Sequence, residues 1–164
     1  MPAPLNVKPS VALPTVIPSI SAAPTITPIA APAKLASEVT KPIPSEKVIS
    51  NLEFYEMSCA ISSITWFELL NGVNLLKDSR KKENLHSFLI DYVQPSFKII
   101  PYDEHAAFIN ASITQKLVPM GFPTPILDTQ IASIALANNL ILVTKNTKDF
   151  QIFKDKCNLP LEEW

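Results

Sequence analysis

The sequence predicts an α/β fold in which a parallel sheet is packed between layers of helices. The first observation is that short apolar runs alternate with longer segments whose apolar residues recur at helical spacing. The second is the run 140–144, LILVT, which is continuously apolar like strands that are buried on both faces. The third is length, because 164 residues suffice for one domain with its own core.

The N-terminal 44 residues are expected to lie outside this domain. They contain ten of the sixteen prolines, no aromatic residue, no glycine and a single acidic residue, Glu38. Because proline removes an amide donor and fixes φ, we expect neither a helix nor a central strand there. The sequence therefore predicts a Pro-rich disordered tail over residues 1–44 and a folded domain over residues 45–164.

From residue 45 onward, helices and short strands alternate along the chain. The helices are expected over 45–57, 65–76, 80–93, 104–118 and 126–139, and the strands over 59–64, 97–102 and 140–144. Residues 147–155 are expected to form a loop or short helix, and residues 158–164 an edge strand.

Several residues signal where these helices begin and end. Thr65 is the predicted N-cap of its helix, and Asp103 is predicted to cap the helix that follows it. Pro95 is expected to end the helix that starts at residue 80, and Pro125 lies near the first turn of a later one. Asn139 is a candidate C-cap.

Composition excludes several classes of function. The net charge of −1 gives no argument for nucleic-acid binding, so any RNA contact has to be local. Cys59 and Cys157 lie too far apart in sequence for a zinc motif and are predicted to be buried thiols in a reducing, cytoplasmic environment. No apolar run approaches the roughly 18 residues of a membrane span, so no membrane association is expected.

Three acidic residues at the edges of apolar elements are the candidate catalytic residues and metal ligands. Glu68 follows the first predicted strand, Asp149 follows the third, and Asp128 opens the helix just before the third. In open parallel sheets ligands bind outside the carboxyl ends of the strands, where these carboxylates can meet. Converging carboxylates are what a magnesium-dependent phosphodiesterase needs.

Each of these residues also has a purely structural interpretation. Glu68 completes a capping box with Thr65, Asp128 places negative charge at a helix N-terminus, and Asp149 belongs to a turn-forming stretch. Apolar residues three, four and seven positions after Asp128 nevertheless turn it toward the buried face, where a charge needs a partner. Gly72, one turn after Glu68, leaves room for a ligand on the same face.

The segment 144–149, TKNTKD, supplies candidates for substrate binding. Thr144 and Asn146 are expected to orient water or substrate, and Lys145 and Lys148 to contact backbone phosphates. The same residues are also typical of an ordinary turn with solvated lysines.

Three segments together resemble the PIN-domain ribonuclease toxins of bacterial toxin–antitoxin pairs, the VapC type. They are ISSITWFELLNGV, LDTQIASIALANNLILVTKNTKDF and the closing LPLEEW, and the resemblance spans residues 46–164. It implies an α/β/α sandwich, Mg²⁺ or Mn²⁺ as cofactor, RNA as substrate, and both a cognate antitoxin and a second copy of the chain as partners. Glu68 matches the second acidic position of the family and Asp128 the third.

The resemblance extends to the fourth conserved region of the family, but the first acidic position has no match. Asn146 stands where many members carry Asp, and Asp149 lies in the Asp-Phe that follows. The family opens with a strand that ends in an Asp, and no such motif precedes residue 46. The sequence therefore predicts that both the first strand and the first catalytic Asp are missing, as in a frameshifted or decayed copy.

The preferred hypothesis is a Mg²⁺-dependent endoribonuclease toxin of a type II toxin–antitoxin pair. The absent first ligand leaves its activity open at this stage. One alternative is a catalytically inactive remnant that binds an antitoxin or dimerises through residues 53–61 and the helices between 64 and 93. Another is a receiver-like regulatory module, which is disfavoured because no acidic pair follows an early strand.

Overall fold

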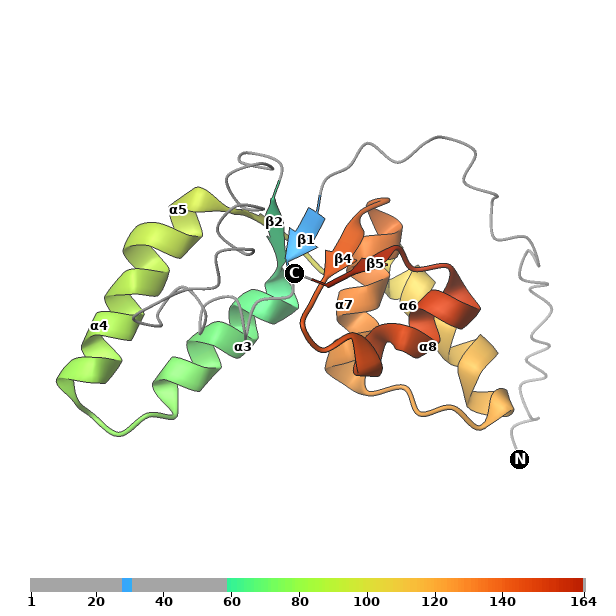
Figure 1. The fold of residues 1–164 in the computed structure, drawn as a ribbon, viewed down its shortest axis with the longest axis horizontal. Helices are drawn as coiled ribbons and strands as arrows, with labels where there is room; N and C mark the ends of the chain where they lie inside the picture. Colours follow the sequence, from blue (N-terminus) through green and yellow to red (C-terminus); the bar gives the residue numbers. More distant parts are fainter. Residues whose placement is uncertain (1–27, 31–58, 164) are drawn as a thin grey trace, which may run out of the picture.

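The computed structural model describes residues 59–163, together with the backbone of residues 28–30. Its strands form one sheet in the order β3-β2-β1-β4-β5, and every neighbouring pair is parallel (Figure 1). The strands are β1 (Pro28–Ala30), β2 (Ala60–Ser62), β3 (Lys98–Ile100), β4 (Ile141–Val143) and β5 (Leu161–Glu162). The strands predicted over 59–64, 97–102 and 140–144 are confirmed, and the closing segment is an edge strand as expected.

The centre of the sheet is β1, which lies inside the stretch predicted to be a disordered tail. Ile29 is in register with Ala60 of β2 on one side and with Leu142 of β4 on the other. The prediction that no central strand runs through residues 1–44 is therefore wrong at residues 28–30. Pro28 occupies the first position of the strand, where proline is tolerated. The other residues of the predicted tail, and the helix predicted over 45–57, lie outside the described part of the chain.

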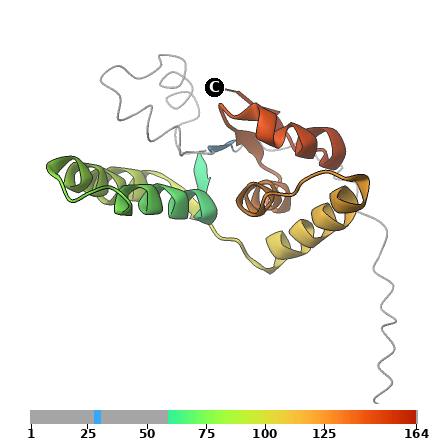
Figure 2. The same ribbon diagram turned by 90° about the horizontal axis from the view of Figure 1, so that it is seen from below.

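Helices cover both faces of the sheet, which confirms the predicted α/β/α sandwich. In Figures 1 and 2 the helices α3 and α4 lie on one side of the strands, and α6, α7 and α8 on the other. The helical segments are α3 (Ser63–Asn74), α4 (Arg80–Phe88), η2 (Leu89–Val93), α5 (Gln94–Ser96), α6 (Glu104–Leu117), η3 (Val118–Met120), α7 (Ile126–Ala137) and α8 (Thr147–Cys157).

Two hydrophobic clusters correspond to the two faces. Ala60 belongs to the larger cluster, formed with α6, α7 and α8, while the next residue, Ile61, belongs to the smaller cluster under α3 and α4. This is the alternation that a strand imposes, since successive side chains point to opposite faces. Phe153 is fully buried in the larger cluster, and Leu89 is buried in the smaller one.

The N-cap of the helix after β2 lies three residues earlier than predicted. Ser62, in extended conformation at the end of the strand, is the N-cap, and its Oγ accepts a hydrogen bond of 2.9 Å from the amide of Thr65. The predicted capping box of Thr65 and Glu68 is therefore wrong, because Thr65 already lies inside the helix. The strand runs directly into α3 with no intervening loop, so the cap falls on the last strand residue.

Of the other predicted helix boundaries, the N-cap at Asp103 is confirmed, and the helix end at Pro95 is not. Asp103 caps α6 as expected, and its Oδ1 accepts a 2.9 Å hydrogen bond from the amide of Ala106. Pro95 does not end its helix, because the π-helical turn η2 precedes it and α5 continues to Ser96. A π-turn shifts the hydrogen-bond pattern just before a residue that has no amide to donate. The predicted C-cap Asn139 is wrong by one residue, because Asn138 is the C-cap of α7 and Asn139 follows it with a positive φ of 54°.

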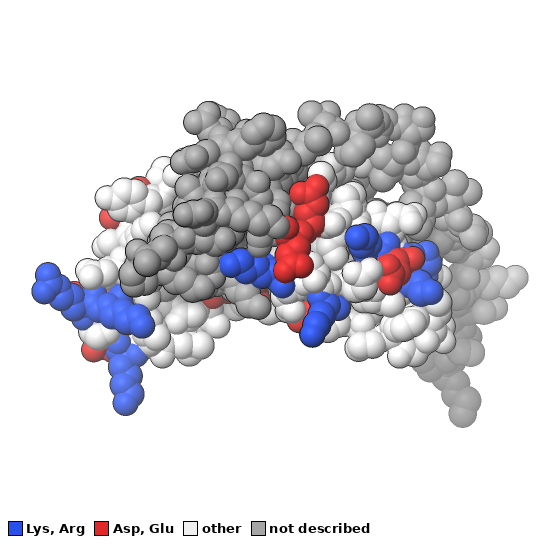
Figure 3. All heavy atoms as spheres, viewed as in Figure 1, with Lys and Arg blue, Asp and Glu red and all other residues white. Residues whose placement is uncertain are grey.

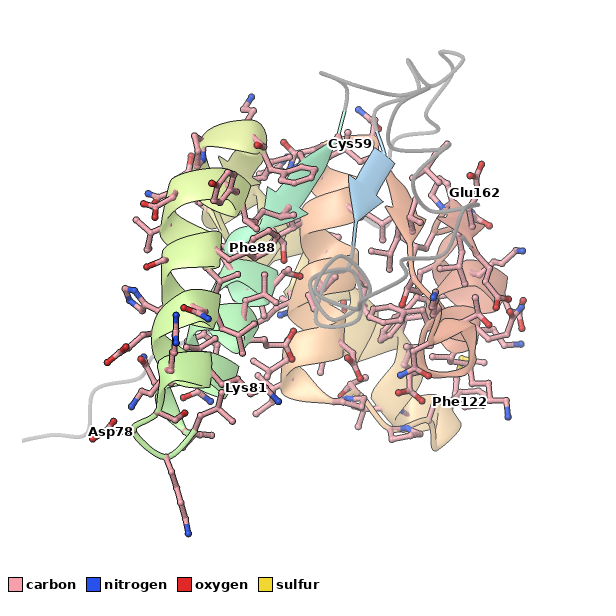
Figure 4. The ribbon with its side chains drawn as sticks, turned by 60° about the vertical axis from the view of Figure 1, so that its left-hand side comes forward. Cys59, Asp78, Lys81, Phe88, Phe122 and Glu162 are labelled. Carbon is pink, nitrogen blue, oxygen red and sulfur yellow. The ribbon has the colours of Figure 1, made fainter. Side chains whose placement is uncertain are left out.

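Both cysteines are free, as expected. Cys59 is buried at the entrance to β2 (Figure 4) and Cys157 is half-buried at the end of α8. Burial raises the pKa of both thiols, which disfavours the reactive thiolate. Within the described residues, no helix is long and apolar enough to cross a membrane.

Candidate metal centre at the carboxyl edge of the sheet

Glu68 is placed by the junction between β2 and α3. The Ser62 cap starts the helix at the carboxyl end of the strand, and Glu68 follows in the second turn. Its side chain is half-buried, and burial together with the negative charge of Asp128 raises the pKa of its carboxyl group. The neighbouring Gly72 lies in open space, as expected for a position that leaves room beside Glu68.

Asp128 lies in the first turn of α7 and is half-buried. The apolar residues Ile131, Ala132 and Ala135 are buried, which confirms the prediction that this face of the helix points into the protein. The N-cap, Pro125, offers no side-chain hydrogen bond, and its carbonyl accepts from both the amide and the hydroxyl of Thr129. Burial, and then the charge of Asp149, raise the pKa of Asp128.

Asp149 is exposed in the first turn of α8, which follows β4. Its carboxylate accepts a hydrogen bond from the side-chain amide of Asn146. The backbone amide of Asn146 in turn donates to Thr144 Oγ1 at 3.0 Å, and Thr144 is buried at the end of the strand. The stretch that was predicted to be a loop or short helix is thus a full helix of 11 residues with a structured entrance.

The three candidate carboxylates lie on three helices, and the middle one, Asp128, interacts electrostatically with each of the other two. Helix α7 packs against both α3 and α8, and this packing brings Asp128 within electrostatic reach of Glu68 on one side and Asp149 on the other. Asp128 lies 60 positions after Glu68 in the sequence, and Asp149 lies 21 positions after Asp128. The fold therefore gathers distant residues at one edge of the sheet. The proximity agrees with the prediction, while the catalytic and ligand roles of the three residues stay predictions.

Within the part of the chain that the structure describes, Glu68 and Asp128 lack a basic partner. Among the described residues, neither Glu68 nor Asp128 forms an ion pair with a lysine or arginine. Figure 3 shows acidic side chains near the middle of one face, with basic side chains directly beside them as well as at the far end by α3 and α4. Half-buried like charges without a basic partner favour binding of a proton or a cation.

The donor set fits one kind of divalent cation site. No three acidic, histidine or cysteine side chains in the described part of the chain are grouped closely enough to enclose a metal ion. Mg²⁺, however, is usually held by one or two carboxylates, with water and substrate phosphate oxygens completing its shell. The pair Glu68 and Asp128, with Asp149 beside it, offers hard oxygen ligands of that type. The residues therefore fit an open Mg²⁺ or Mn²⁺ site.

The remaining predicted site residues surround the start of α8. Lys145 and Asn146 are half-buried between β4 and the helix, and Lys148 is exposed in its first turn. Thr144 already uses its hydroxyl oxygen to accept the Asn146 amide. The proposed roles in substrate binding are compatible with these positions and stay predictions.

Two features of this region were not predicted from the sequence. The first is the hydrogen bond from Asn146 to Asp149, which depends on the rotamers of both side chains and so cannot be read from the sequence. The second is Thr65, one turn before Glu68, whose buried Oγ1 has no hydrogen-bond partner among the described residues. A buried hydroxyl without a partner costs free energy. A threonine near a helix start is typical of an N-cap, so its sequence position carries no signal of a buried hydroxyl without a partner.

Comparisons with known proteins agree with the fold. The model of the PIN domain family matches residues 40–156. Toxin FitB of Neisseria gonorrhoeae is 34% identical over 117 residues, which are 70% of this chain and 84% of FitB. Ribonuclease VapC of Rickettsia bellii is 33% identical over 91 residues, 56% of this chain and 67% of that protein.

Solved structures give the same result. The crystal structure of FitAcB from N. gonorrhoeae aligns with a TM-score of 0.70 at 29% identity, covering 83% of this chain and 95% of that one. VapBC2 from Rickettsia felis, bound to a DNA fragment from its promoter, aligns with a TM-score of 0.68 at 30% identity, covering 85% and 98%. The parallel sandwich, the arrangement of the acidic residues and these matches lead to one conclusion: the chain belongs to the PIN domain family.

Proposed function

We propose that this protein is a metal-dependent endoribonuclease and acts as the toxin of a toxin–antitoxin pair. The observation that best supports this proposal is the cluster of Glu68, Asp128 and Asp149 on three packed helices at the carboxyl edge of the sheet. The named ribonucleases among its relatives, and the toxin–antitoxin complexes among similar structures, support the class of reaction and the kind of partner.

The protein's own residues would position the reacting groups. Glu68 and Asp128, with Asp149, would hold Mg²⁺ or Mn²⁺ through carboxylate oxygens. A bound divalent cation lowers the pKa of a coordinated water and stabilises negative charge on a phosphodiester during attack. Lys145 and Lys148 would contact backbone phosphates on either side of the cleaved bond, and Thr144 and Asn146 would keep the loop in place beside them.

The cognate partners follow from the same class. A cognate antitoxin would cover the toxin, and a second copy of the chain would complete a homodimer. The proposed location is the cytoplasm, where RNA is available. Size-exclusion chromatography with light scattering, with and without a candidate antitoxin, would measure both associations.

The proposal is tested by cleavage of RNA by the purified full-length protein. Cleavage of a structured RNA should require Mg²⁺ or Mn²⁺ and stop with EDTA. Asp128→Asn and Glu68→Gln should each lower the rate by at least about a hundredfold, the scale expected for loss of charge stabilisation at the reacting centre. Asp91→Asn and Glu83→Gln make the same chemical changes at exposed positions away from the cluster and should leave the rate unchanged.

Equal cleavage by the wild-type protein and the Asp128→Asn variant would reject the site. Absence of cleavage by a folded wild-type protein, under conditions in which it binds its antitoxin, would instead support the inactive remnant. The missing catalytic Asp would explain that outcome. In the family this Asp ends the first strand, whereas here the first acidic residue after β1 is Glu38.

A further inference from the structure

We infer that Asn146 is a positioning residue that aims the Asp149 carboxylate at the cation, an inference that rests on the proposed function. The side-chain amide of Asn146 donates a hydrogen bond to the carboxylate of Asp149 at the start of α8. The charge of Asp149 in turn acts on Asp128. Asn146 would therefore influence the metal centre through its neighbour rather than as a ligand of its own.

The geometry of α8 does not explain this hydrogen bond as helix capping. Asn146 is the N-cap residue, and Asn at this position ordinarily accepts a hydrogen bond from a backbone amide in the first turn. In α8 the N-cap makes no such side-chain hydrogen bond. It uses its donor on the side chain at the third helical position, which reverses the usual capping box. The helix gives up a cap, and the carboxylate is held in one orientation.

The backbone of Asn146 is also held in place by a hydrogen bond to Thr144. Its backbone amide donates to Thr144 Oγ1 at 3.0 Å, and Thr144 is buried at the carboxyl end of β4, next to the central strand. A continuous set of hydrogen bonds therefore connects the sheet edge, through Thr144 and Asn146, to the exposed carboxylate of Asp149. An exposed aspartate has several open rotamers, so fixing it lowers the entropy lost when it binds a cation.

A positioning role and a direct ligand role make different predictions, because the Asn146 side chain also has an oxygen that can bind a cation. If Asn146 acts through Asp149, its removal has no effect once Asp149 has lost its charge. If Asn146 binds the cation itself, its removal weakens binding whether or not Asp149 is intact. A double-mutant cycle on cation affinity separates the two.

The experiment measures Mn²⁺ affinity of the full-length protein by electron paramagnetic resonance, without RNA. Four proteins are compared: wild type, Asn146→Ala, Asp149→Asn and the double variant. Asn146→Ala is expected to weaken Mn²⁺ binding about tenfold in the wild-type background, the low end for a residue that orients a ligand. It is expected to change affinity less than about twofold in the Asp149→Asn background. Equal losses in both backgrounds, or no loss in either, would overturn the inference.

A matched control lies on the same helix. Gln151 donates its side-chain amide to the carboxylate of Asp155 at 2.7 Å, between one and two turns further along α8 than the pair of Asn146 and Asp149. Gln151→Ala removes the same kind of hydrogen bond away from the metal centre and is expected to leave Mn²⁺ affinity unchanged. A loss as large as that of Asn146→Ala would show that the effect comes from α8 as a whole.

Asn146→Ser separates positioning from helix stability. Serine is a good N-cap acceptor but its short hydroxyl cannot replace the amide donor to Asp149. The variant is expected to keep or raise the thermal midpoint while it weakens Mn²⁺ binding. A parallel fall in both would assign Asn146 a structural role. If the wild-type protein itself binds no Mn²⁺, the metal centre of the proposed function fails as well, whereas normal binding without coupling overturns only this inference.

Discussion

At the scale of single residues, the site contains carboxylates whose negative charge is unfavourable in the folded protein. Glu68 and Asp128 are half-buried, each is close to another carboxylate, and the pKa of each is raised by burial first and then by the neighbouring charge. The folded protein thus disfavours the ionised form of both carboxyl groups. The fold therefore tolerates a strained group of charges at the place where a cation would relieve it.

The first prediction is that removing one of these charges stabilises the protein without a cation. Asp128→Asn should increase the free energy of unfolding at pH 7 in EDTA by on the order of 0.5–1 kcal/mol after solvent screening, because the raised pKa marks a charge that is less favourable in the folded state. Thermal unfolding would show a midpoint about 2–4 °C higher.

The isosteric change Asp91→Asn, at an exposed position, serves as the control and should shift the midpoint little. Addition of Mg²⁺ should raise the midpoint of the wild-type protein more than that of the Asp128→Asn protein, since a ligand stabilises the state that binds it. A midpoint lowered by Asp128→Asn would mean that the carboxylate has a stabilising partner instead.

The second prediction concerns pH. A carboxyl group whose pKa is raised in the folded state binds more protons there than in the unfolded state, so its contribution to stability is full below its ordinary pKa and is lost as pH rises through the raised value. For Glu68 and Asp128 these windows begin at ordinary values of 4.5 and 3.8 and extend upward.

Protons and cation compete for the same oxygens, so Mn²⁺ affinity should fall as pH decreases through this window. The fall should start at a higher pH than ordinary carboxyl values would give. Titration of Mn²⁺ binding between pH 4 and 8, by the approach used for Asn146, measures it. Glu68→Gln should move the midpoint of the fall to lower pH, because one proton-binding group and one repelling charge are gone. An unchanged midpoint would show that Glu68 takes no part in binding.

At the scale of elements, the junction between β2 and α3 positions Glu68. The strand ends at Ser62, whose buried side chain caps the helix that begins at the next residue. The orientation of α3, and with it the place of Glu68, therefore depends on a cap at the carboxyl edge of the sheet.

The third prediction is that Ser62→Ala lowers the free energy of unfolding by about 1–2 kcal/mol, the upper range for loss of an N-cap, because the amide that it satisfies is buried. Urea unfolding would measure the change. Ser79 is the matched control: it caps α4 at an exposed site through a 3.3 Å hydrogen bond, so Ser79→Ala should cost less than about 1 kcal/mol. Equal losses would contradict a special role of the buried cap.

The junction between β2 and α3 shows that the sequence predicts where an element lies better than it predicts the residue at which the element begins. Apolar spacing located α3 and β2 correctly, since periodicity depends on the faces that are buried. Two consecutive serines and a threonine all suit an N-cap, and only the conformation of Ser62 selects one of them. Asp103 was predicted correctly because a single capping residue precedes its helix. The link from Asn146 to Asp149 depends on rotamers, which the sequence does not encode locally.

At the scale of the whole molecule, the sheet depends on its central strand. The sequence predicted the three strands with apolar runs but excluded β1, because dense proline removes amides that a central strand uses. The exclusion failed because the spacing of the prolines matters more than their number: residues 29–31 form a short run without proline, and Pro28 stands at the first strand position. The acidic residue expected to follow this strand remains absent from the sequence before Glu38.

The fourth prediction tests that strand. Ile29→Pro should abolish cooperative unfolding, because residue 29 pairs with β2 and β4, and a proline there removes an amide in the middle of the sheet. Ile29→Val keeps the backbone amide, and Pro28→Ala changes only the first strand position, so both should unfold with midpoints near that of the wild type. Circular dichroism during thermal unfolding distinguishes the outcomes. A cooperative, wild-type transition for Ile29→Pro would show that the sheet forms without β1.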